Sequence, residues 1–133
     1  MRLSRYLLLL FFFTGVSGCE KDTLTLLTEG EWQFENMITY SSITSIYEYT
    51  EAKKIVLING TLVFNSDGTY ILDSPEIDAE TGTWVLRGSE LILNKGTNRS
   101  VSIDEISRDK LVYHETALYL NRDPYTISYY WKR

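Results

Sequence analysis

Short runs of β-branched, aliphatic and aromatic residues alternate with clusters of Gly, Asn, Asp and Ser along most of this chain. Such spacing is typical of antiparallel strands joined by tight turns. The clearest hairpin joins residues 60–64 to residues 69–73, and its Asp67-Gly68 pair suits the positive φ that a chain reversal needs. Residues 74–80 are predicted to form a polar loop. The same pattern predicts further strands at residues 31–40, 81–86, 90–94, 100–106, 110–120 and 125–132.

The predicted strands follow one another without helical βα units between them. This order favours an all-β fold, an antiparallel up-and-down meander of about eight strands that closes into a barrel. A β-sandwich is the alternative, although an immunoglobulin-like one would have longer crossings and paired cysteines around a Trp. Residues 43–58 are ambiguous, and we expect a strand at 46–49 followed by a short helix or loop. Period-two spacing places four residues of the first strand on its core face: Trp32, Phe34, Ile38 and Tyr40.

Residues 1–18 differ from the rest of the chain. They contain no acid, two bases at Arg2 and Arg5, an apolar run at 6–13 and then small residues, which is the pattern of a signal peptide. The apolar run is too short for a transmembrane helix, which needs ~20 residues. The segment Val16-Ser17-Gly18-Cys19 resembles the lipobox of bacterial lipoproteins. The resemblance implies cleavage between Gly18 and Cys19 and acylation of the Cys19 thiol and amine by chains such as palmitate; the alternative is a free Cys in an ordinary secretory signal.

The next residues are polar, so residues 19–27 are predicted to be a tether and residues 28–133 the folded domain. In the lipoproteins that the lipobox resembles, Asp after the acylated Cys often marks inner-membrane retention, so Glu20 favours the outer membrane. The Glu20-Lys21-Asp22 segment is similar to acidic signals that send some Gram-negative lipoproteins to the cell surface, although a solvated tether explains it equally well. We therefore expect a domain facing either the periplasm or the outside. Asp22-Thr23-Leu24 resembles a bacterial O-glycosylation signal, with Thr23 as the acceptor.

Four short motifs resemble the small lipocalin-like lipoproteins of Gram-negative bacteria. They are Gly30-Glu31-Trp32, the segment from Phe64 to Tyr70, Gly82-Thr83-Trp84 and Leu91-Ile92-Leu93. In lipocalins the Trp of the Gly-x-Trp motif plugs the closed end of the barrel, so the resemblance implies this position for Trp32. The sequence departs from full-length lipocalins because it is shorter and lacks a Thr-Asp-Tyr-type second motif.

Composition and motifs argue against several functions. The 18 acids outnumber the 13 bases, which argues against nucleic-acid binding, and one Cys with one His leaves no disulfide framework and no zinc site. No nucleophile elbow, phosphate loop or zinc-protease motif occurs, so we expect no enzyme and no cofactor. His114 and Glu115 are adjacent in a strand and face opposite ways. Four acids could hold calcium weakly, although solvated charge is the default: Asp73, Glu76, Asp78 and Glu80.

Four aromatic residues are candidates for either a packed core or a ligand cavity, with the core favoured: Trp32, Tyr70, Trp84 and Trp131. The preferred function is a lipid-anchored envelope module, non-catalytic, that binds a small apolar or amphipathic molecule. The alternative is an accessory protein of an envelope complex, with a filled barrel, that contacts its partner through Tyr47, Tyr49 or Tyr130.

Overall fold

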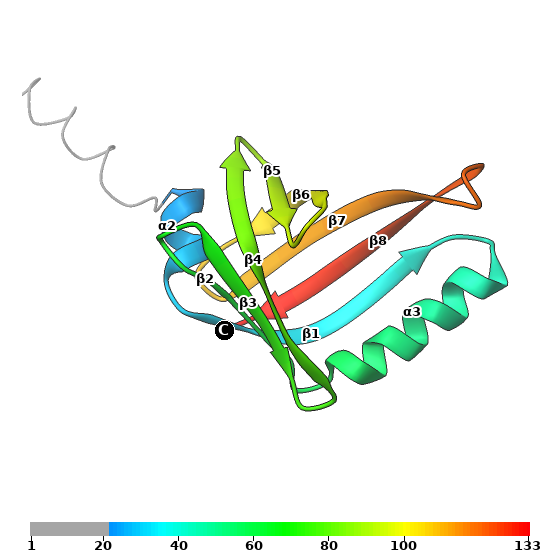
Figure 1. The fold of residues 1–133 in the computed structure, drawn as a ribbon, viewed down its shortest axis with the longest axis horizontal. Coiled ribbons are helices and arrows are strands. Elements are labelled where there is room, and N and C mark those ends of the chain that lie inside the picture. The colour runs from blue at the N-terminus through cyan, green and yellow to red at the C-terminus, as the bar shows by residue number, and fades with distance from the viewer. Residues whose placement is uncertain (1–21) are drawn as a thin grey trace, which may run out of the picture.

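Eight antiparallel strands close into a barrel in the computed structural model, which describes residues 22–133 (Figure 1). Each strand pairs with the next, and the last strand pairs with the first. The predicted up-and-down barrel is therefore confirmed, and the β-sandwich alternative is wrong. The strands are β1 (Glu31–Tyr40), β2 (Thr61–Phe64), β3 (Thr69–Ser74), β4 (Ile77–Arg87), β5 (Glu90–Asn94), β6 (Asn98–Ile106), β7 (Lys110–Tyr119) and β8 (Asp123–Lys132).

The turn chemistry of the β2–β3 hairpin agrees with the prediction. Gly68 has a φ of 90°, and the Asp67 carboxylate accepts a hydrogen bond of 3.0 Å from the Thr69 amide. Three strands begin two or more residues earlier than predicted: β4 at Ile77, inside the predicted polar loop, β6 at Asn98 and β8 at Asp123. The longer β4 brings Glu80 into the sheet.

The strands of the barrel differ in how far they pair. β1 pairs with β2 only from Glu31 to Gln33, whereas its pairing with β8 continues to Tyr40. β7 and β8 pair along their whole length, so β1, β8 and β7 extend together beyond the other strands (Figure 1). The barrel therefore opens where β1 separates from β2.

Residues 44–57 form one helix, α3 (Thr44–Leu57), in the connection between β1 and β2. The predicted strand at 46–49 is wrong. Ile46, Thr50 and Leu57 share the buried face of the helix, and the Thr50 hydroxyl donates to the Ile46 carbonyl at 2.8 Å. Packing of this face outweighs the strand preference of the local Ile and Tyr residues. Figure 1 shows α3 alongside the extended part of β1, at the open end of the barrel.

A β-bulge changes which residues of β1 face the core. The register with β8 shifts between Phe34 and Asn36. Trp32 and Phe34 are buried as predicted, but beyond the bulge Met37 is fully buried and Tyr40 is 58% exposed. The extra residue reverses the inward and outward alternation, so the predicted core positions of Ile38 and Tyr40 are wrong.

A short helix, α2 (Thr23–Thr28), lies at the other end of the barrel (Figure 1). The Asp22 carboxylate caps it by accepting a hydrogen bond of 2.7 Å from the Thr25 amide. Leu27 is fully buried, so residues that the sequence assigned to a tether are packed against the barrel. Neither α2 nor α3 is long and apolar enough to span a membrane.

Trp32 plugs the barrel beside α2, where the lipocalin resemblance places it. Its indole N–H donates to the Leu27 carbonyl at 3.2 Å, and the Arg133 guanidinium lies 3.7 Å from the centre of its ring. Arg133 also donates to the Leu26 carbonyl at 2.9 Å. Arg133 thus ties α2 to the plug and closes this end.

Every strand has a hydrogen-bonded neighbour on both sides within residues 22–133. The core cluster runs from Leu27 in α2 to Trp131 in β8. The strand pairing is incomplete only toward the open end, where β1 leaves β2 after Gln33. Residues 22–133 therefore contain all eight strands of the barrel and its core cluster.

Gly82 is a position where no side chain fits. It pairs with Tyr70 on β3, and a Cβ here would lie 2.3 Å from the Asn94 carbonyl oxygen and 2.7 Å from the Tyr70 ring. We expect Gly82→Ala to lower the free energy of unfolding by about 1–3 kcal/mol because both neighbours must move. Urea denaturation of residues 22–133 measures this. Thr81→Ala, an exposed change on the same strand, should cost under about 0.5 kcal/mol, and equal losses in both variants would contradict the prediction.

Candidate functional site

A cavity of about 350 Å³ lies between α3 and the inside of the barrel mouth. It is within the range of ~300–1,000 Å³ typical of small-molecule sites, at the lower end. Its lining is mainly apolar, with a few charged groups. The lining residues are Tyr49, Ala52, Lys53, Val56 and Leu57 of α3, Leu72 of β3, Ile77 and Glu80 of β4, and Arg99 of β6.

One backbone hydrogen bond and one side-chain hydrogen bond hold the C-terminal end of α3 against the barrel. The Gly60 amide donates to the Leu57 carbonyl at 2.7 Å, and the Ser74 hydroxyl donates to the Val56 carbonyl. These contacts tie the helix to the start of β2 and the end of β3. They place Val56 and Leu57 over the mouth, where they form part of the cavity wall.

Arg99, which lines the cavity, is held by an ion pair with Glu115. Arg99 donates to both carboxylate oxygens of Glu115, at 2.6 and 2.8 Å, and the Tyr129 hydroxyl donates to the same carboxylate at 2.6 Å. The Tyr129 ring stacks on Tyr113 at 5.1 Å between centroids. Burial raises the pKa of Glu115, but the hydrogen bonds and charge of Arg99 outweigh it, and the pKa is lowered overall.

A second carboxylate, Glu80, lies between the cavity and a smaller hollow of about 200 Å³. It accepts hydrogen bonds from the Tyr70 hydroxyl at 3.0 Å and from the Lys95 ammonium at 2.9 Å. Burial and the bond to Glu80 raise the pKa of Tyr70 to about 12. Burial raises the pKa of Glu80, but its two donors outweigh burial and lower the pKa overall. The prediction of Glu80 as a solvated loop acid is therefore wrong.

Lys53 is the cation that α3 directs to the cavity. Its ammonium lies 5.7 Å from the centre of the Tyr129 ring and 5.9 Å from that of Tyr49. Within residues 22–133 no carboxylate lies within 4 Å of it. Burial, followed by the Arg99 charge, lowers the pKa of Lys53.

Of the four aromatic candidates, the three tryptophans belong to the packed core and the tyrosine lies at a hollow. Trp32 is the plug, and Trp131 is fully buried against Phe34 with ring centroids 5.5 Å apart. Trp84 packs edge-on against Phe64 and donates from its indole N–H to the Thr69 carbonyl at 2.9 Å. Tyr70, the fourth, lines the smaller hollow beside Glu80.

The inward-facing pair Arg99 and Glu115 was missed by the sequence reasoning. Arg99 lies two residues before the buried Val101, and Glu115 lies two residues after the buried Tyr113. Period-two spacing therefore puts both charges on the inner face, which was the available signal.

The remaining polar candidates do not form a reactive centre. The His114 ring binds the Asp104 carboxylate at 2.7 Å, and Glu115 binds Arg99, so the two neighbours face apart as predicted. Asp73, Glu76 and Asp78 are exposed, and no group of three or more metal-ligating side chains gathers within residues 22–133.

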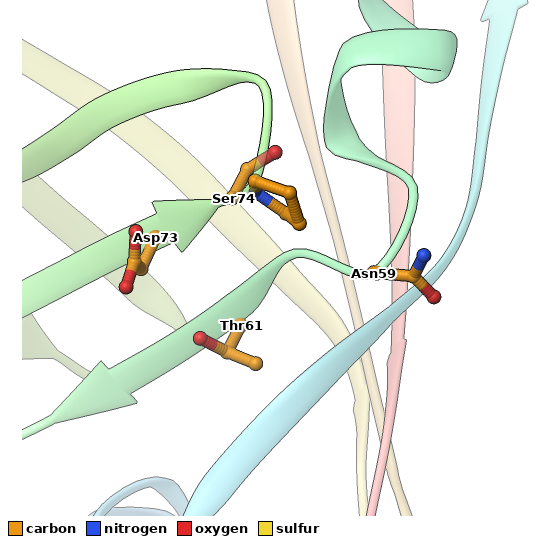
Figure 2. Close-up of a pocket in the computed structure, with 5 residues that line it drawn as sticks. Asn59, Thr61, Asp73 and Ser74 are labelled. Atoms are coloured by element: carbon orange, nitrogen blue, oxygen red, sulfur yellow. The ribbon is translucent and has the colours of Figure 1, made fainter.

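A surface hollow of about 280 Å³ lies beside the ends of β2 and β3, lined by Asn59, Thr61, Asp73, Ser74 and Pro75 (Figure 2). Figure 2 shows Thr61 and Asp73 side by side on their paired strands, while Asn59 lies apart on the connection. The Ser74 hydroxyl is already bonded to Val56. These side chains do not converge, so the cavity beneath α3 is the better candidate.

The residues proposed for modification and for protein contact have the following positions. Gly18 and Cys19 lie outside the described residues. Thr23 is the first residue of α2, directly after the capping Asp22. Tyr47 and Tyr49 are exposed on α3, whereas Tyr130 is half-buried.

No protein-family model and no curated protein matches the sequence. Among solved structures, the chain is similar to bovine odorant-binding protein complexed with its natural ligand, with 13% identity and a TM-score of 0.52 over 88% of this chain and 76% of that one. It is equally similar to the odorant-binding protein from bovine nasal mucosa, with 13% identity and a TM-score of 0.52 over 88% of this chain and 77% of the other. At such low identity the likeness shows the fold alone, and that fold is the closed eight-stranded lipocalin barrel.

Proposed function

We propose that this protein is a non-catalytic, lipid-anchored protein of the bacterial cell envelope that binds a small apolar or amphipathic molecule beneath α3. The observation that carries the proposal is the mainly apolar cavity at the open end of a barrel whose other end is packed solid around Trp32. A ligand of this kind gains most of its binding energy from burying apolar surface. The solved relatives in fold include a protein bound to its natural ligand.

The polar groups at the cavity favour binding over catalysis. The carboxylates of Glu80 and Glu115 are each held by a cation and a tyrosine hydroxyl. These bonds lower both pKa values, so neither carboxylate is suited to act as a general base near neutral pH. No residue that lines the cavity is a nucleophile paired with a base.

The proposed location depends on Cys19, three residues before Asp22. An acylated Cys19 would attach the protein to the outer membrane close to α2, which lies at the closed end, opposite α3 (Figure 1). The cavity would then face away from the anchoring membrane, toward the periplasm or the outside. Intact-mass measurement of the protein from bacterial membranes would test this location, since a Cys19 without acyl chains overturns the anchor.

A filled barrel that acts only through protein contacts is the less favoured function. The cavity of about 350 Å³ remains open in the barrel mouth, and one of the proposed contact residues, Tyr49, lines it. Organic extraction of residues 22–133 purified from bacteria, followed by mass spectrometry, tests the binding function directly. A stoichiometric small molecule is the expected result. An empty extract together with no binding of an apolar probe would overturn the proposal.

Blocking the cavity should abolish this binding. Ala52 is an exposed residue of α3 that also lines the cavity, so Ala52→Trp places an indole at the entrance without disturbing the core. We expect affinity for N-phenyl-1-naphthylamine, an uncharged fluorescent probe, to fall by about tenfold or more. Ile55→Trp is the matched control, because Ile55 is exposed and lies outside the lining. If the two variants bind the probe equally, the ligand occupies another place.

A further inference from the structure

We propose that the ligand is a single-chain amphiphile with an anionic headgroup of the carboxylate kind, and that Lys53 pairs with this headgroup beneath α3. The inference rests on the proposed binding function and names the chemistry of the ligand. The lower-end volume of the cavity suits one short chain better than the two chains of a bilayer lipid.

The charges around the cavity are not balanced. Glu80 is bound by Lys95, and Glu115 is bound by Arg99, so two of the three cations there have a carboxylate partner. Lys53 is the third, and its ammonium has no carboxylate within 4 Å in the described part of the chain. The site therefore has one positive charge in excess, which a single anionic group would neutralise.

The position of Lys53 favours an external acceptor. Its ammonium lies near the faces of Tyr49 and Tyr129, and rings offer only a weak electrostatic contact to a group that has three N–H donors. No hydrogen bond from this ammonium to a residue of 22–133 is formed. Burial also removes part of its hydration and lowers its pKa. A carboxylate of the ligand would supply charge-assisted hydrogen bonds that water and the rings do not fully provide.

The neighbours of Lys53 on α3 suit the tail of such a ligand. Val56 and Leu57 lie three and four residues further on, so all three share one side of the helix. Across the cavity, Leu72 and Ile77 continue the apolar wall. One helix face thus offers a cation for the head and aliphatic side chains for the tail.

The other cation that lines the cavity, Arg99, already has a carboxylate partner inside the barrel. Arg99 could also attract an anion, but both its Nε and Nη2 atoms are bonded to Glu115. The Glu115 carboxylate also neutralises the Arg99 charge, so an anion gains less electrostatic energy beside Arg99 than beside Lys53. Among the described residues Lys53 has no carboxylate partner within 4 Å, so it is the group that selects the headgroup.

The test compares three ligands with the same chain length: decanoate, decanol and decyltrimethylammonium. Each competes with N-phenyl-1-naphthylamine for residues 22–133 at neutral pH. Because an ionised headgroup is more costly to remove from water than a hydroxyl, apolar burial alone would favour decanol. We expect decanoate to bind about tenfold more tightly than decanol, and decyltrimethylammonium to bind most weakly.

Variants of Lys53 and of the adjacent Lys54 test whether Lys53 causes the preference for decanoate. Lys53→Met keeps a long unbranched stem and removes the charge, so the preference for decanoate should disappear while the affinity for decanol is retained. Lys53→Arg should keep the preference. Lys54→Met is the matched control, because Lys54 pairs with Glu51 at 3.1 Å and does not line the cavity. It should bind all three ligands as the unmodified protein does.

The outcomes separate this inference from the proposed function. Equal binding of decanoate and decanol by the unmodified protein would overturn the anionic headgroup and leave the binding function standing. A carboxylate preference that survives in Lys53→Met would overturn the role of Lys53. If none of the ligands and no probe binds, the proposed function itself fails.

Discussion

Replacing Trp32 with alanine is expected to lower the free energy of unfolding by about 3–5 kcal/mol, the largest stability loss of any single change considered. Trp32 is fully buried, and its removal leaves a cavity at the closed end of the barrel. The change also strips the Leu27 carbonyl of its donor and the Arg133 guanidinium of the ring it lies on. Urea denaturation followed by circular dichroism would measure the loss.

Two companion variants test whether the plug is responsible. Trp32→Phe keeps much of the apolar volume and loses the indole N–H, so a smaller cost of about 1–2 kcal/mol is expected. Tyr40→Ala removes a large aromatic from the same strand where it is 58% exposed, and should cost under about 0.5 kcal/mol. A Trp32→Ala loss no greater than that of Tyr40→Ala would mean that the closed end is not packed as described.

Replacing Arg99 with methionine is expected to cost about 2 kcal/mol at neutral pH, because it leaves the Glu115 carboxylate in the barrel without its main partner. The cost should stay below the ~3–5 kcal/mol of a fully buried pair, since the Arg99 side chain is 34% exposed to solvent. The double variant Arg99→Met with Glu115→Leu should recover most of the loss, because no unpaired charge remains. Denaturation of the single and double variants measures both effects.

The pH dependence of stability is a second test of the Arg99–Glu115 ion pair. The pKa of Glu115 is lowered in the folded protein, so the carboxylate stabilises the fold above its ordinary pKa of 4.5, and this contribution is lost as the pH falls through the lowered value. In Arg99→Met, burial without the cation would raise that pKa and favour the protonated form. The stability difference between the two proteins should therefore be largest at neutral pH and shrink as the pH falls below 4.5 and through the lowered pKa of Glu115. A difference that is constant with pH would contradict the ion-pair explanation.

The two ends of the barrel differ in packing: one end is filled and the other holds a cavity. At the closed end, α2, Trp32 and Arg133 fill the space with buried aromatic and backbone contacts. At the open end, β1 leaves β2 after Gln33, and α3 covers the gap without filling it. The buried contacts that stabilise the folded barrel lie mostly in its core. A change at the mouth, such as Ala52→Trp, is therefore expected to alter ligand binding with little effect on the free energy of unfolding.

Local patterns in the sequence were sufficient to predict the fold class and the order in which the strands pair. Period-two spacing located the later strands, Asp67-Gly68 located a hairpin turn, and the absence of βα units indicated an up-and-down barrel. The Gly-x-Trp resemblance also placed Trp32 correctly. These features depend on neighbours only a few residues apart, so a single sequence contains them. The lipobox at Cys19 is of the same local kind and stays a prediction.

The tertiary structure decided the site. Residues 46–49 resemble a strand locally, yet they form part of α3 because Ile46 and Leu57 are buried against the barrel. The bulge after Phe34 appears only when β1 is aligned with β8, and it exchanges Met37 for Ile38 in the core. Lys53, Glu80 and Arg99 come from three different elements, and closure of the barrel is what brings them to one cavity and Glu115 to Arg99. Such contacts join residues far apart in the chain, so their energies depend on packing that no local pattern records.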